Sequence, residues 1–89
     1  MKISSIHYSD AFKAQFDKLQ KEIQIKAVKT INLFRENPFY PSIRLHKLKG
    51  KLYGLWSISL DLRYRIIFKI TDDGVVLLVS IGTHAIYDE

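Results

Sequence analysis

The stretch that decides the fold is residues 61–84, DLRYRIIFKITDDGVVLLVSIGTH. It predicts a β-hairpin with strands at 63–70 and 75–81, because Asp-Gly in the turn Asp72-Asp73-Gly74 between apolar runs is a strong hairpin signal. Side chains alternate along a strand, so the first strand has an apolar face and a face that carries Arg63, Arg65 and Lys69. The second strand is apolar on both faces, which predicts a central position in the sheet.

Upstream of the hairpin, the pattern predicts an N-terminal strand over residues 1–8 and then two helices. Ser9 and Asp10 can cap the start of the first helix, a break is expected near 18–21, and Asn37-Pro38 ends the second helix. Further strands are expected at 43–47 and 55–60, joined by a turn. The expected core residues are Phe12, Phe16, Ile23, Ala27, Ile31, Phe34, Trp56, Ile58, Tyr64, Ile66 and Phe68.

The element order is therefore β-α-α-β-β-β-β, with a helical hairpin packed on a mostly antiparallel sheet. This order predicts an α+β fold. The length of 89 residues suits a single domain covering 1–89. No apolar run approaches the roughly 20 residues that span a bilayer, and the chain contains no cysteine. Together these features predict a cytoplasmic protein without membrane association, disulfides or thiolate metal sites.

Charge is unevenly distributed along the chain, whose formal net charge is +5. No acidic residue lies between Glu36 and Asp61, whereas that interval contains four cations: Arg44, Lys47, Lys49 and Lys51. A basic patch of this kind attracts polyanions or an acidic protein, although a solvated surface is the simpler interpretation of a lysine run. Because the patch precedes a hairpin with more arginines, we favour nucleic acid as the partner.

Two of the three histidines suggest chemistry. His46 lies beside Arg44 in the acid-free interval, and His84 follows the last strand, whereas His7 has no evident partner and is expected to be structural or at the surface. A histidine can act as general acid or base, and an arginine can stabilise charge on a phosphate. RNA carries its own nucleophile, the 2′-hydroxyl. No third ligand accompanies His46 and His84, so we expect neither a metal nor a cofactor; His84 as a hydrogen-bonded turn residue remains the structural alternative.

Four segments carry a resemblance to a known family: His46–Gly50 (HKLKG), Gly54–Ser57 (GLWS), Arg63–Phe68 (RYRIIF) and Gly82–His84 (GTH). Through them the whole chain resembles the RelE/ParE superfamily of bacterial toxins from type II toxin–antitoxin modules, and most of all its YafQ/RelE branch of mRNA interferases. The resemblance implies an endoribonuclease that cleaves mRNA on the ribosome, a role in plasmid stabilisation, and a cognate antitoxin. It also implies that the toxin–antitoxin complex binds operator DNA.

The resemblance also implies roles for individual residues. His84 falls where the YafQ branch has its principal catalytic histidine, His46 where it has a second one, and Arg65 where RelE-like toxins have a phosphate-stabilising arginine. Tyr87 lies near an aromatic residue of the family's tail and joins the catalytic candidates. The residues expected to hold the RNA backbone are Arg44, Lys47, Lys49, Lys51 and Arg63.

Three residues depart from the family pattern. Ser57 and Ser59 stand where RelE has lysines, Ser59 also replaces a YafQ histidine, and Arg63 stands where YafQ has an aspartate. Two alternatives to mRNA cleavage therefore stay open: a ParE-like inhibitor of DNA gyrase that uses the helical hairpin, and a degenerate protein that binds its antitoxin only. The antitoxin segment is expected to be acidic or amphipathic and to bury the helical hairpin or cover the Arg63/Arg65 face.

Overall fold

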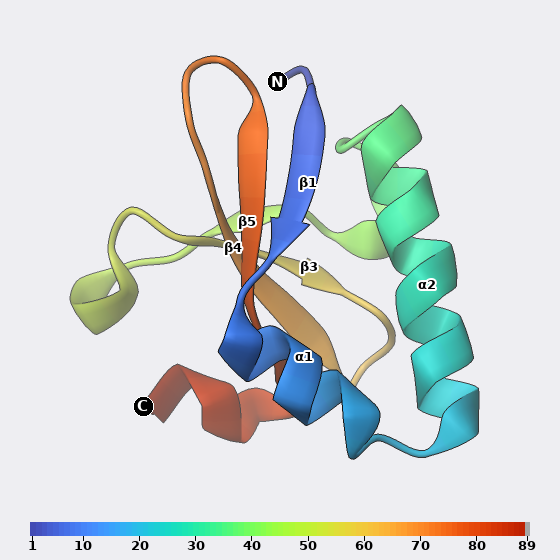
Figure 1. The fold of residues 1–89 in the computed structure, drawn as a ribbon. Helices are drawn as coiled ribbons and strands as arrows, with labels where there is room; N and C mark the ends of the chain where they lie inside the picture. Colours follow the sequence, from blue (N-terminus) through green and yellow to red (C-terminus); the bar gives the residue numbers. More distant parts are fainter. Residues whose placement is uncertain (89) are drawn as a thin grey trace.

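Two helices pack against one face of a five-stranded sheet in a computed structural model that describes residues 1–88, with the backbone alone at 87 and 88 (Figure 1). The strand order is β1-β5-β4-β3-β2. β1 runs parallel to β5, and the other neighbouring pairs are antiparallel. The predicted α+β class is thereby confirmed. The elements are β1 (Ser5–Tyr8), α1 (Asp10–Asp17), α2 (Lys21–Glu36), η1 (Pro41–Ile43), β2 (His46–Lys47), η2 (Gly50–Leu52), β3 (Trp56–Ser59), β4 (Arg65–Ile70), β5 (Val75–Gly82) and η3 (His84–Asp88), where η marks a 3-10 helix.

The helices begin and end where the sequence predicts. The Ser9 hydroxyl accepts the Phe12 N–H at 3.0 Å and donates to the Val79 carbonyl at 2.7 Å, so the cap of α1 is also tied to β5. α2 ends at Glu36, and Asn37 takes an extended conformation before Pro38, as proline requires of the residue that precedes it.

The main core lies between the helices and the sheet. Phe34 of α2 and Phe68 of β4 are fully buried, with ring centroids 4.8 Å apart. The predicted core is confirmed in most positions; Phe16, Trp56 and Tyr64 are half-buried and not fully covered. The main cluster of buried residues contains Phe12, Ala27, Ile31, Phe34, Ile43, Ile58, Ile66, Phe68, Val76, Leu78 and Ile81.

The hairpin between β4 and β5 has the predicted turn. Gly74 has a φ of 83°, and a Cβ there would lie 2.1 Å from the backbone oxygen of Lys2, so the turn needs glycine both for its conformation and for space. The sequence predicts a central position for β5, and β5 is indeed an interior strand. The middle strand of the five is β4, however, because β1 pairs with the other edge of β5. β5 is apolar on both faces because both are covered: Val76 and Leu78 belong to the main core, and Val79 packs against a smaller apolar cluster on the other face.

The strand expected at 43–47 is wrong over its first half. Pro41 begins a 3-10 turn in which the Arg44 N–H donates to the Pro41 carbonyl at 3.2 Å, and Arg44 has a left-handed φ of 47°. The strand is therefore reduced to His46–Lys47. The alternation of Ile43 and Leu45 reflects packing against the main core and not strand pairing.

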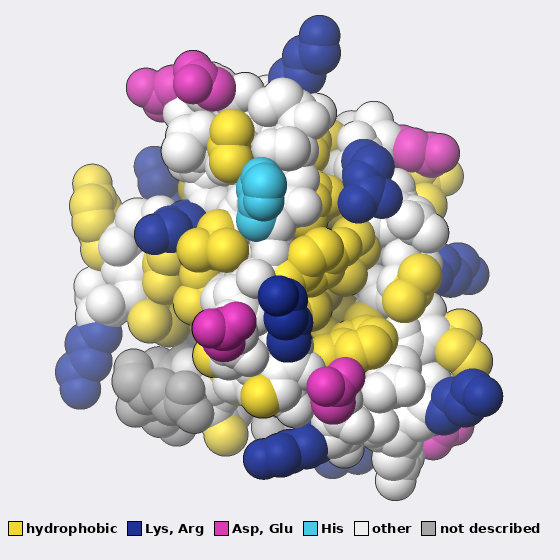
Figure 2. Space-filling view, in the orientation of Figure 1, with side chains coloured by type: hydrophobic (Ala, Val, Ile, Leu, Met, Phe, Trp, Pro, Cys, Tyr) yellow, Lys and Arg dark blue, Asp and Glu magenta, His cyan; other side chains and the backbone are white. Residues whose placement is uncertain are grey.

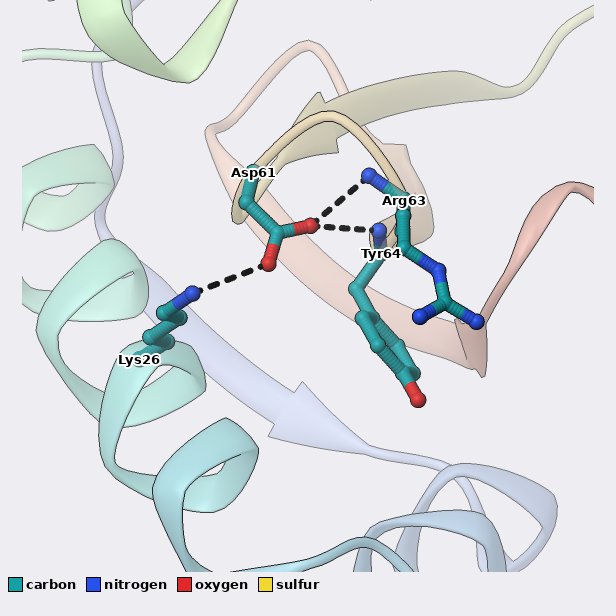
Figure 3. A network of polar contacts seen from close by, with 4 residues as sticks. All are labelled: Lys26, Asp61, Arg63 and Tyr64. Atoms are coloured by element: carbon teal, nitrogen blue, oxygen red, sulfur yellow. Dashed lines mark hydrogen bonds and ion pairs between the residues drawn. The ribbon is translucent and has the colours of Figure 1, made fainter.

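The strand expected at 63–70 begins two residues late. The Asp61 carboxylate accepts the backbone N–H groups of Arg63 and Tyr64, each at 2.8 Å, and this bends the chain before β4 (Figure 3). Arg63 therefore belongs to the loop between β3 and β4, and strand alternation does not decide where its side chain points. β1 is likewise shorter than predicted, covering Ser5–Tyr8.

The sheet face opposite the helices carries a second, smaller apolar cluster. Its buried members are Leu48, Ile67 and Ile86, from the loop after β2, from β4 and from η3. In Figure 1, the η2 loop and η3 lie on the side of the sheet away from α2. The cluster holds these two segments against an otherwise open face.

Within residues 1–88, no helix is long and apolar enough to cross a membrane.

Candidate functional site

Strand register brings the principal candidates to the open face. His46 of β2 lies opposite Ser57 of β3, and Ser59, two residues further along β3, lies opposite Arg65 of β4. Residues two apart on a strand share a face. His46, Ser57, Ser59 and Arg65 therefore line one side of the sheet. Arg65 in turn lies opposite Gly82 of β5, and His84 follows two residues later.

A cavity of about 680 Å³ occupies this face. Six of the predicted site residues line it. Ser57 and Ser59, the two serines that depart from the family pattern, also form part of its wall. Its lining is Arg44, Leu45, His46, Leu48, Lys49, Lys51, Leu52, Ser57, Ser59, Arg65 and His84. No carboxylate occurs among these residues. A concave, cationic surface with two imidazoles suits a phosphate and the proton transfers at a phosphate ester.

Arg65 is held in place by a buried hydroxyl. Its Nη1 donates a hydrogen bond to Ser59 Oγ, and the Ser59 side chain is almost fully buried. The sequence signalled Ser59 only as a departure from the family pattern. Its position directly opposite Arg65 depends on the strand register, which the sequence does not specify by itself.

A smaller hollow of about 300 Å³ adjoins the cavity. It is lined by Leu62, Arg63, Arg65, Thr83 and His84, so Arg65 and His84 line both hollows. Arg63 belongs to this second hollow and does not line the larger cavity. Its guanidinium carbon lies 5.9 Å from the centroid of the Tyr64 ring, within the range of a cation–π contact.

Two other residues of interest, Lys47 and His7, lie away from the cavity. Lys47 follows His46 in β2 and faces the other side of the sheet, with Nζ 5.6 Å from the centroid of Trp56. His7 lies in β1, at the opposite edge of the sheet from β2, with Nε2 3.2 Å from Ser5 Oγ. The Tyr87 side chain lies outside the described part of the chain. In that part, no group of three or more His, Asp or Glu residues is arranged to hold a metal.

Asp61 organises the loop that carries Leu62 and Arg63. Besides accepting two backbone N–H groups, its carboxylate accepts a hydrogen bond from Lys26 Nζ of α2 at 3.1 Å (Figure 3). The N–H of Tyr64 contributes most to a lowered pKa of this carboxyl, and the other contacts add to it against the effect of burial. The ionised carboxylate is therefore the form that fits this loop.

A second exposed surface is apolar. Figure 2 shows hydrophobic side chains gathered in a hollow between β1 and α1 on one side and α2 on the other, with basic and acidic side chains around it. Tyr8, Phe12, Phe16, Val28 and Ile31 line this groove. The groove continues along α2 past the exposed Ile25. Such a surface suits an amphipathic partner segment more than a phosphate.

The chain matches a known protein family over most of its length. Residues 21–89 match the model of the ParE-like toxin domain. This stretch begins with α2 and contains every residue of the cationic cavity. No curated protein sequence matches the chain at a significant level.

Solved structures with the same fold include two toxins and a chain of a toxin–antitoxin complex. YafQ from E. coli strain BL21(DE3) has a TM-score of 0.79 at 23% identity, covering 94% of this chain and 97% of YafQ. RelBE2, a toxin–antitoxin complex from Mycobacterium tuberculosis, gives 0.77 at 18% identity, with 96% and 95% covered. The YoeB/ParE toxin from Agrobacterium tumefaciens gives 0.76 at 15% identity, with 91% and 99% covered. At these identities the likeness is one of fold.

Proposed function

The chain belongs to the family of ParE-like toxin domains, and we propose that this toxin acts by cleaving mRNA on the ribosome. The observation that carries the proposal is that His46, Arg65 and His84 line one cavity. The other residues that line it include three cations and no carboxylate. These three residues come from β2, β4 and the start of η3. A protein that only bound a partner protein would have no need to assemble two imidazoles and a guanidinium around one concave site.

The proposed reaction is transesterification within the RNA backbone. The 2′-oxygen attacks the adjacent phosphorus, its proton passes to one histidine, and a new 2′-O–P bond forms. The bond from phosphorus to the 5′-oxygen breaks, and that oxygen takes a proton from the other histidine. The products are a 2′,3′-cyclic phosphate and a 5′-hydroxyl. We assign His84 as the principal acid or base and His46 as its counterpart.

Arg65 would stabilise the phosphorane through its guanidinium fork. Ser59 supports this role because its hydroxyl receives a hydrogen bond from Nη1 and limits how far the guanidinium can turn. Arg44, Lys49 and Lys51 would bind flanking phosphates, and Arg63 would do so from the adjoining hollow. Lys47 is left out of this set, because it lies over Trp56 on the other face.

We further propose a cognate antitoxin that docks in the apolar groove between α1 and α2. RelBE2 has the same fold and was solved as a toxin–antitoxin complex. In this chain the groove offers exposed apolar side chains at Ile25 and Val28. Basic residues outnumber acidic ones in its lining: Lys13, Lys21, Lys29 and Arg35 against Asp17 and Glu36. An amphipathic segment with acidic flanks would match both features.

The proposed function is tested with wild type, His84→Ala and His7→Ala side by side. We expect His84→Ala to lower ribosome-dependent mRNA cleavage by about 10²–10⁴-fold, the usual contribution of a general acid or base. Growth arrest on induction should be lost in parallel. His7→Ala is the matched control, because His7 lies in β1 away from the cavity, and it should retain both effects.

Other outcomes would select another activity. Growth arrest by wild type and by His84→Ala alike, without RNA cleavage, would contradict the proposal and favour inhibition of DNA gyrase. Absence of arrest and of cleavage in wild type would favour a protein that only binds its antitoxin. A thermal unfolding scan of each variant separates a loss of chemistry from a loss of fold.

A further inference from the structure

The two hollows on the open face share a wall. Arg65 and His84 line both, whereas His46, Lys49 and Leu52 line the larger one alone and Leu62, Arg63 and Thr83 the smaller one alone. Residues common to two adjoining hollows lie at the boundary between them. A phosphate bound by Arg65 and His84 would therefore sit at this boundary, with space on either side.

We propose that the smaller hollow is a second nucleotide subsite, so that the protein holds the two nucleotides flanking the scissile phosphate in separate hollows. The inference rests on the proposed cleavage of RNA and adds the path of the substrate. One nucleotide would occupy the larger cavity beside His46, and its neighbour would occupy the hollow beside Arg63. Their volumes, about 680 and 300 Å³, both fall within the range of ordinary small-molecule sites.

The loop that forms the outer wall of the smaller hollow is fixed in position. Asp61 accepts the N–H groups of Arg63 and Tyr64, and Lys26 of α2 donates to its second oxygen (Figure 3). The loop is thus fastened both to its own backbone and to the helical layer. A wall held by several hydrogen bonds is preorganised, and binding there loses less entropy than binding to a loose loop.

The side chains of this hollow suit a nucleotide. Leu62 is 80% exposed and offers an apolar surface on which a base can lie. Arg63 supplies a guanidinium for a phosphate oxygen, and Thr83 supplies a hydroxyl. Because Arg63 contacts the face of Tyr64, part of its conformational freedom is already restricted before RNA binds.

The test compares two probes on the intact protein: nucleoside monophosphates, and a dinucleotide with a 2′-O-methyl group that blocks cleavage. In wild type, the dinucleotide should bind about tenfold more tightly, as expected for one added charged hydrogen bond and base contact. Arg63→Ala should remove most of this advantage and leave monophosphate binding unchanged. Lys69→Ala is the matched control, because Lys69 is an exposed cation of the same hairpin that lines neither hollow.

NMR supplies a second readout that does not depend on a variant. The dinucleotide should shift the backbone amides of Leu62 and Thr83 together with those of His46 and Lys49, whereas a monophosphate should shift the latter pair alone. Equal effects of Arg63→Ala on both probes, or no shift at Leu62 and Thr83, would overturn the second subsite and leave the proposed cleavage standing. Failure of both probes to perturb His46 or His84 would overturn the proposed function as well.

Discussion

Ile67 and Phe68 are neighbours in β4 and are both buried, yet they belong to opposite faces of the sheet with different compositions. Phe68 faces the helices and joins a continuous apolar core. Ile67 faces the other way, into a small cluster with Leu48 and Ile86, beside Arg65 and the cavity. The helix-covered face supplies most of the apolar burial, which leaves the open face free to carry exposed cations and histidines.

The largest expected effect of this difference between the two faces is on the free energy of unfolding. Phe68→Ala should lower the free energy of unfolding by about 3–5 kcal/mol, whereas Ile67→Ala should cost about 2 kcal/mol because its cluster is small. Urea denaturation followed by Trp56 fluorescence measures both. If Phe68→Ala does not fold, Phe68→Leu replaces it. Equal losses at the two positions would show that the open-face cluster is as important to the fold as the main core.

The next prediction concerns activity on the open face. Ser59→Ala should lower cleavage about tenfold, the value of one charged hydrogen bond that orients Arg65. Ser80→Ala is a matched control, since Ser80 is also a buried serine of the sheet and lies opposite Ile67, but it lines neither hollow. Ser59→Thr keeps the hydroxyl and should restore activity. A loss shared by Ser80→Ala and Ser59→Ala, or no rescue by threonine, would argue against a role in positioning Arg65.

A smaller effect should separate two neighbouring lysines. Lys49→Ala should weaken RNA binding a few fold and reduce the slope of log affinity against log salt by about 0.7, the value for one phosphate contact on a single strand. Lys47→Ala should leave that slope unchanged, because Lys47 lies over Trp56 on the other face. Affinity measured between low and moderate salt gives both slopes. A reduced slope for Lys47→Ala would place RNA on the helical side of the sheet.

The smallest effect on stability is expected from Asp61, whose carboxylate links the loop before β4 to Lys26 of α2. Its pKa is held below the usual value of an aspartate, chiefly by the Tyr64 N–H. Its contribution to stability is therefore fully present above that usual value and is lost as the pH falls through the lowered pKa. Asp61→Ala should thus have a lower Tm than wild type at neutral pH, and the gap should close in acid. Lys26→Met should give a smaller loss, because the Tyr64 N–H contributes most to the shift. A gap that is independent of pH would contradict this account.

The helix-covered face is also the one that the sequence predicted best. Apolar periodicity defined both helices and most core residues, since burial and period are linked directly. The start of β2 and the start of β4 were placed wrongly because single interactions decided them: the 3-10 turn at Pro41 and the Asp61 carboxylate on two backbone N–H groups. Such local capping of the backbone competes with strand pairing and leaves little trace in the hydrophobic pattern.

For the open face, the sequence indicated which residues matter but not how they are arranged in space. His46, Arg65 and His84 were identified by type and by resemblance, but their convergence required the register of three strand pairs. The register also set Ser59 against Arg65, whereas Lys49 was separated from Lys47 because β2 ends at Lys47 and Lys49 is the N-cap of the 3-10 turn that follows. A one-residue difference in register reverses the face of every side chain in a strand, so a run of lysines could not be assigned to one surface from the sequence.

The parallel pairing of β1 with β5 bears on how the protein is made. Ser9, which caps α1, bonds to Val79, 70 positions later, and His84 lies beyond that strand. Synthesis at about 5–20 residues per second separates the emergence of the two helices from that of β5 by several seconds. The growing chain therefore presents its helical segments to a partner first, and it acquires a complete cavity only near the end of translation. Under the proposed function, an antitoxin that docks on those helices would reach the toxin before its cavity is complete.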